Sequence, residues 1–190
     1  MKAKTVALAL LIAIALVSCV PVAKIHPTAQ TPQRLREIQE ATIYELLLQA
    51  ECKSSYQGSP VLIIDQTVSE ISFDEESVFW IEPSLDKETW EQYIKINQSS
   101  QAFIPDLSIH KFCMFITSDE LVSLTQKDPN WFNDHMVISF SRVGFSSSLD
   151  QALVYREYNC GGECAGGDLY FLVLENNLWK IKNTVGGWNS

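Results

Sequence analysis

The chain has 190 residues, and its 14 Lys and Arg against 23 Asp and Glu give a formal net charge of −9. Nucleic-acid binding depends on basic surface that displaces counterions from phosphates, so this composition argues against a nucleic-acid partner. It argues equally against docking on anionic lipid through charge alone. The acidity is best explained as a feature that keeps the protein soluble.

The N-terminus carries the pattern of a bacterial export signal. Lys2 and Lys4 precede an apolar run over residues 6–17. A membrane-spanning helix needs ~20 apolar residues, so the run is too short to span, and its flanks are those of a signal peptide. We therefore predict that residues 1–18 are a signal peptide and take no part in the folded domain.

The tetrapeptide Leu16-Val17-Ser18-Cys19 resembles the lipobox of bacterial lipoproteins. The resemblance implies cleavage before Cys19, a diacylglyceryl group on its thiol and a fatty acid such as palmitate on its new amine. Several acyl chains anchor a protein stably, at ~0.8 kcal/mol per buried methylene. The predicted partner is thus a membrane of the cell envelope, reached through lipid on Cys19. Val20 in place of Asp favours the outer membrane if the host is Gram-negative. The alternative is an ordinary secretory signal in which the cysteine is incidental.

Residues 34–190 have the size of a single domain, and the proline-containing segment 19–33 is expected to be a flexible tether. Apolar residues at near-helical spacing predict a helix from about Pro32 to Ala50, with the proline in its first turn. The β-branched run after Pro60 predicts a buried strand, and residues 71–81 suggest a second short strand. Asp86 suits the N-cap of a helix that ends near residue 97.

Further along, a strand is expected over residues 111–117, followed by a short helix capped by Ser118 or Asp119 and a helical turn near Trp131. Four strand-like runs follow, at residues 137–145, 151–159, 168–176 and 178–185. Short links favour antiparallel neighbours, and Asn176-Asn177 suits a two-residue hairpin. The predicted fold is therefore α+β, with N-terminal helices packed on a C-terminal four-stranded antiparallel meander.

The cysteines indicate disulfide chemistry. The chain has five, so setting Cys19 aside leaves four, and an even number in an exported protein indicates disulfides. Cys160 and Cys164 share a glycine-rich loop between two predicted strands, so we expect them to pair and to pin this loop. A bridge from this loop to Cys52 or Cys113, a redox-active pair and a metal site are the alternatives. Cys113 is also explained as a buried free thiol.

The C-terminal part resembles a module found in uncharacterised bacterial exported proteins. The resemblance is carried by residues 141–145 (SRVGF), 152–155 (ALVY), 160–167 (CGGECAGG), 178–181 (LWKI) and the final WNS. It covers roughly residues 110–190, under half of the chain. It implies a shared fold unit, and the family has no activity to carry over.

The sequence predicts no catalytic residue, no cofactor and no metal site. It has no G-x-S-x-G nucleophile elbow, and its three histidines are not spaced as zinc ligands. Arg142 is a lone cation among apolar strand residues, so it either pairs with a carboxylate or lines a pocket. We expect non-enzymatic binding, with an envelope protein as partner. The alternative is an envelope hydrolase or thiol-redox enzyme that uses Arg142 and the loop with Cys160 and Cys164.

Overall fold

The computed structural model describes residues 31–69, 73–103, 112–162 and 164–189. All the elements below belong to one unit of the chain, Pro32–Ser190. The predictions for the signal peptide, for Cys19 and for nearly all of the tether therefore lie outside the described residues.

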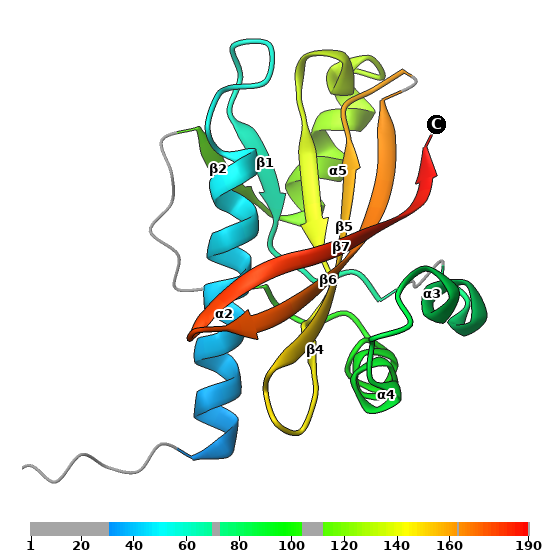
Figure 1. Cartoon of the computed structure of the whole chain (residues 1–190). Helices are drawn as coiled ribbons and strands as arrows, with labels where there is room; N and C mark the ends of the chain where they lie inside the picture. Colours follow the sequence, from blue (N-terminus) through cyan, green and yellow to red (C-terminus); the bar gives the residue numbers. More distant parts are fainter. Residues whose placement is uncertain (1–30, 70–72, 104–111, 163, 190) are drawn as a thin grey trace, which may run out of the picture. The chain divides into compact units, whose positions relative to one another are not determined.

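One mixed sheet organises the domain (Figure 1). The described strands follow the order β2-β1-β3-β5-β6-β7, and β4 pairs with β5. β1 is parallel to both β2 and β3, while β3, β5, β6 and β7 pair antiparallel in succession. In chain order the elements are α2 (Pro32–Glu51), β1 (Val61–Ile64), α3 (Glu75–Ile81), α4 (Lys87–Ile96), β2 (Cys113–Ile116), α5 (Ser118–Lys127), the 3₁₀ turn η1 (Trp131–Asp134), β3 (Val137–Phe140), β4 (Gly144–Phe145), β5 (Gln151–Asn159), β6 (Ala165–Glu175) and β7 (Leu178–Asn189).

The predicted α+β fold with a four-stranded antiparallel meander is wrong. The described residues form four α-helices and a seven-stranded sheet that is partly parallel. The antiparallel order of the last strands was expected, but β1 and β2 extend the same sheet instead of standing apart. The physical reason lies in the connections, since a long crossover through helices allows parallel pairing whereas a short link does not.

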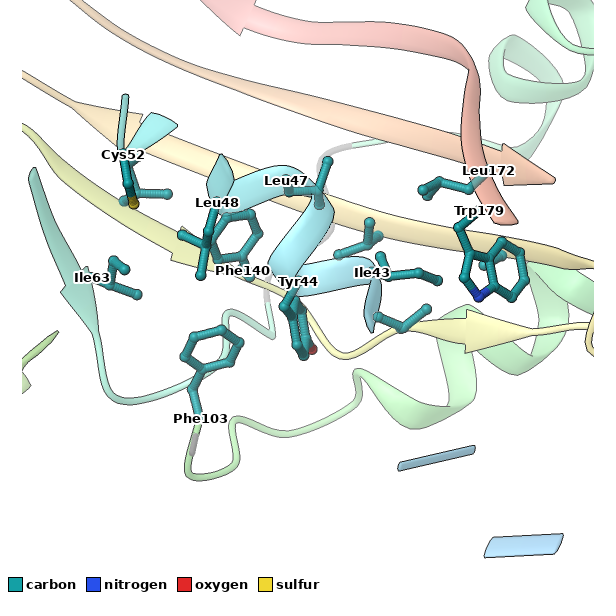
Figure 2. Close-up of a cluster of buried hydrophobic side chains, with 14 of the residues drawn as sticks. Ile43, Tyr44, Leu47, Leu48, Cys52, Ile63, Phe103, Phe140, Leu172 and Trp179 are labelled. Atoms are coloured by element: carbon teal, nitrogen blue, oxygen red, sulfur yellow. The ribbon is translucent and has the colours of Figure 1, made fainter. Parts of the chain in front are cut away.

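Helices cover both faces of this sheet. Side chains of a strand alternate between its two faces, so neighbouring residues of β1 enter different layers. Ile63 belongs to the buried cluster under α2, on the side of Leu48 and Phe140 (Figure 2). Leu62 faces the other layer, which α5 and η1 cover through Leu124 and other apolar residues. Further along this second face, α3 and α4 cover β5, β6 and β7.

Several local predictions are confirmed and two are corrected. The first helix spans Pro32–Glu51, within one residue of the prediction. The turn at Asn176 and Asn177 has φ values of 53° and 61°, as a two-residue hairpin requires. Residues 75–81, expected to be strand, form α3 because Asp74 caps the helix by accepting from the Ser77 amide at 2.8 Å. The N-cap of α5 is Thr117 rather than Ser118 or Asp119.

Candidate functional site

The structure brings the predicted cysteine pair together in the loop between β5 and β6. The Cα atoms of Cys160 and Cys164 are 5.2 Å apart, and the two sulfur atoms lie at disulfide distance. Gly161 and Gly162 have φ values of +77° and +56°, so the tight loop uses the conformational freedom of glycine. The pairing expected from the sequence is therefore compatible with the fold.

A second pair, left unresolved by the sequence, joins Cys52 to Cys113. Their Cα atoms are 5.5 Å apart, and both residues are buried in the core between α2 and the sheet. Cys52 follows directly after α2, and Cys113 begins the edge strand β2. The even number of cysteines could have indicated this pair. If Cys160 pairs with Cys164, only Cys52 and Cys113 remain besides Cys19.

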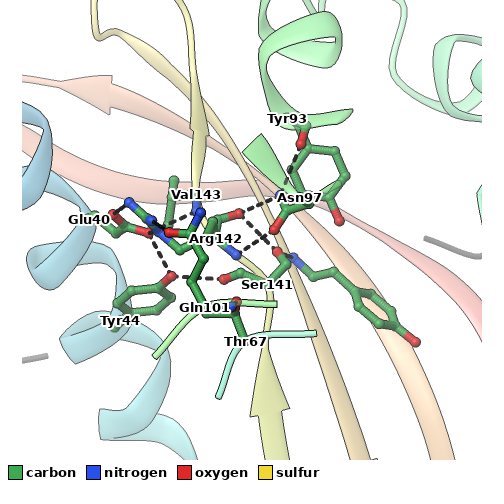
Figure 3. A network of polar contacts seen from close by, with 10 residues as sticks. Glu40, Tyr44, Thr67, Tyr93, Asn97, Gln101, Ser141, Arg142 and Val143 are labelled. Carbon is green, nitrogen blue, oxygen red and sulfur yellow. Dashed lines mark hydrogen bonds and ion pairs between the residues drawn. The ribbon is translucent and has the colours of Figure 1, made fainter. Parts of the chain in front are cut away.

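Arg142 lies just after the end of β3, where it both pairs with a carboxylate and lines a pocket. Its Nε donates to Oε1 of Glu40 at 2.6 Å, and one terminal nitrogen donates to Oε2 at 2.8 Å (Figure 3). The other terminal nitrogen donates to the side-chain oxygen of Gln101. Both readings of this residue from the sequence are therefore correct, and all three guanidinium nitrogens are engaged.

Glu40 is the centre of this polar cluster. Besides Arg142, its Oε1 accepts from the Val143 amide at 3.1 Å and lies 2.8 Å from the Tyr44 hydroxyl. That hydroxyl is also 2.8 Å from the Ser141 carbonyl, so its single proton is shared between two acceptors. Burial raises the pKa of Tyr44 well above its usual value, and the adjacent Glu40 carboxylate raises it further.

Asn97, at the end of α4, holds the main chain of Arg142 from the other side. Its Oδ1 accepts from the Arg142 amide at 2.7 Å, and its Nδ2 donates to the Arg142 carbonyl at 3.0 Å. The Ser141 hydroxyl donates to the same carbonyl at 3.0 Å and accepts from the Tyr155 amide at 2.8 Å. Side chains thus replace ladder partners here, which explains why the strand expected over residues 137–145 is divided into β3 and β4.

We call these residues the Arg142 cluster, and three of them, Glu40, Tyr44 and Arg142, line a pocket of about 480 Å³. Arg34, Glu37 and Ile38 of α2 also line it, as do Thr67 and Phe103. It lies beyond the carboxyl ends of β1 and β3, where open sheets with parallel strands commonly bind ligands. The cluster's side chains hydrogen-bond to one another and to the main chain, so they are held in a defined arrangement.

A second hollow, of about 540 Å³, opens between α5 and the β1–β2 edge of the sheet. Its surface is mainly apolar, and Met114 lines it with 53% of its surface exposed. Trp131 and His135 form its wall as a parallel stack, with ring centroids 4.1 Å apart and an interplanar angle of 3°. We call this hollow the α5 groove. The sequence did not predict it, because its walls come from segments that are distant along the chain.

The structure does not bring Arg142 and the cysteine loop together. Val137, the first residue of β3, pairs with Asn159, so Cys160 lies beside the start of β3. Arg142 follows the end of β3, two residues after Phe140. The predicted cleft shared by Arg142 and the two cysteines is therefore not assembled.

Within the described ranges, no group of three or more His, Cys, Asp or Glu side chains is placed to hold a metal ion. None of the helices in the described part of the chain combines the length and apolar character needed to cross a bilayer. No family model matches the chain, and neither a curated protein nor a solved structure matches it.

Proposed function

We propose that the chain is a lipoprotein of the bacterial cell envelope, anchored through lipid on Cys19, whose domain binds a partner protein without catalysing a reaction. The signal-peptide pattern and the lipobox support export and anchoring. The domain on the far side of the tether supplies the contact surface.

The observation that carries this proposal is the arrangement of the cysteines. The four cysteines other than Cys19 form two pairs at disulfide distance within one domain. Disulfides persist in oxidising compartments such as the bacterial periplasm or the cell surface and are rare in the cytosol. The paired cysteines therefore support the same destination as the N-terminal signal.

Binding is favoured over catalysis because the polar groups of Arg142 already have hydrogen-bond partners within the protein. In the Arg142 cluster, the donors of Arg142 are already engaged by Glu40 and Gln101. The α5 groove is mainly apolar instead, and the exposed side chain of Met114 lines it together with Leu62 and Trp131. Exposed apolar surface bordered by polar residues marks interaction sites, so this groove is the proposed contact surface.

Anchoring is tested by labelling cells that express the full chain with radioactive palmitate. The wild type should carry label and fractionate with membranes, whereas Cys19→Ala should lose both because it lacks the acceptor thiol. Ser18→Ala is the matched control, since a lipobox tolerates small residues at that position. An unlabelled wild type, or a labelled Cys19→Ala variant, would contradict the anchor.

Partner binding is tested by crosslinking and pull-down of the anchored protein with Met114→Glu. A carboxylate in an apolar contact costs ~1.4 kcal/mol or more, so recovery of a specific partner should fall about tenfold. Val122→Glu is the control, because Val122 is 52% exposed on α5 and does not line the groove. Equal losses in both variants would remove the groove from the proposal. Finding no partner, together with a turnover that disappears in Arg142→Ala, would favour an enzyme.

A further inference from the structure

We propose that the Cys160–Cys164 bond is a reversible thiol-exchange site on the folded domain, and that an external dithiol attacks it at Cys164. The inference goes beyond the proposed function, because it holds whether or not Cys19 carries lipid. It rests on the different exposure of the four cysteine residues and on the hydrogen bonds that hold the loop.

The two disulfides differ in the access that they offer. Cys164 is exposed, whereas Cys160, Cys52 and Cys113 are only 3%, 5% and 3% exposed. Cys52 and Cys113 belong to the core under α2, so both sulfurs of that bond are shielded. Exchange requires a thiolate to reach one sulfur of the bond, and exposed disulfides are the labile ones. Cys164 is therefore the point of attack.

The loop is held by more than its sulfur atoms. The Cys160 amide donates to the Cys164 carbonyl at 2.8 Å, and the Cys164 amide donates to the Gly161 carbonyl at 3.0 Å. The Gly161 amide donates to Oδ1 of Asn159 at 3.0 Å. The ladder of β5 and β6 begins beside the loop, with Asn159 opposite Ala165. Opening the disulfide thus leaves the two cysteines as neighbours, ready to close again.

The exchange proceeds in two balanced steps. A thiolate of the dithiol attacks Sγ of Cys164, a mixed disulfide forms, and Cys160 leaves as a thiolate that takes up a proton. The second thiolate of the dithiol then attacks the dithiol's own sulfur in the mixed disulfide. Cys164 leaves as a thiolate and is protonated. The domain gains two electrons and two protons, and the dithiol becomes a disulfide. A dithiol carries both of the thiols that the two steps require.

The first test uses limited reduction of the native full chain by dithiothreitol, followed by alkylation and peptide mapping. Cys160 and Cys164 should be alkylated together, at least ~10-fold faster than Cys52 and Cys113, because thiol reactivity follows exposure. Reduction of all four cysteines at one rate, or of Cys52 and Cys113 first, would overturn the proposal.

The second test assigns the attacked sulfur with two matched variants. Cys160→Ala and Cys164→Ala lack the same bond, and each keeps one thiol of the pair. With glutathione disulfide, the Cys164 thiol of the first variant should form a mixed disulfide ~10-fold faster than the Cys160 thiol of the second. Circular dichroism checks that both variants are folded. Equal or reversed rates would overturn the assignment to Cys164.

Discussion

Glu40 and Arg142 are 102 residues apart in the sequence and satisfy much of each other's hydrogen-bonding capacity. The sequence predicted that Arg142 pairs with a carboxylate, but it did not identify the partner. The helical spacing of the sequence indicates the partner. Glu40 lies three and four residues before the buried Ile43 and Tyr44, so it is on the same face of α2. An acidic residue on the apolar face of a helix was the signal for a buried ion pair.

Replacing Glu40 tests this pair. Glu40→Gln removes the carboxylate while Arg142 remains charged and only 25% exposed, so the free energy of unfolding should fall by about 2–3 kcal/mol. Urea unfolding followed by circular dichroism measures the change. Glu37→Gln is the control, since Glu37 is exposed one turn earlier on α2 and should change stability by less than about 0.5 kcal/mol. Similar effects of the two substitutions would show that the pair does not stabilise the domain.

The ionisation of Tyr170 should lower the free energy of unfolding at alkaline pH. Burial raises its pKa to about 12, with Asp168 and Glu51 adding to the shift and Arg156 opposing it. The unfolded chain ionises this phenol near pH 10, so the stabilisation is complete below pH 10 and is lost as the pH rises toward 12. In Tyr170→Phe, the free energy of unfolding should therefore decline less steeply between pH 10 and 12. An unchanged slope would contradict the raised pKa.

At the scale of elements, local patterns predicted α2, β5 and the β6–β7 hairpin, but not the place of β1 and β2. The first strand reads VLII, a continuous apolar run of the kind that parallel strands buried on both faces show. Helices separate β1, β2 and β3, which is the alternation of a parallel sheet. The β-branched and aromatic residues after Phe73 favour a strand in the sequence. The structure has a helix there, and the acidic residues in the first turn of α3 favour that helix.

The disulfide from Cys52 to Cys113 ties α2 to the edge strand. It closes a loop with a sequence separation of 61, against 4 for Cys160 and Cys164. In the chain-entropy model, replacing both members by Ala should cost about 4 kcal/mol for the first pair and about 2 kcal/mol for the second. Thermal unfolding of the two double variants compares them. A larger loss from the loop pair would contradict the assignment of the structural role to Cys52 and Cys113.

For the whole molecule, the proposed location in the cell envelope and the chemistry of the five cysteines support each other. Lipid on Cys19 and two disulfides would occupy all five cysteines of the chain. An exported lipoprotein offers the compartment in which both modifications form. Neither the charge nor the strand pattern could predict this pairing in full, because the contact between Cys52 and Cys113 arises only once the sheet is assembled.

The most direct test is the intact mass of the full chain extracted from bacterial membranes after alkylation of free thiols under denaturing conditions. We predict a chain that begins at Cys19, carries the mass of a diacylglyceryl group and an amide-linked acyl group, and has no alkyl group on Cys52 or Cys113. A chain that retains residues 1–18, or that carries alkyl groups on Cys52 or Cys113, would contradict the account.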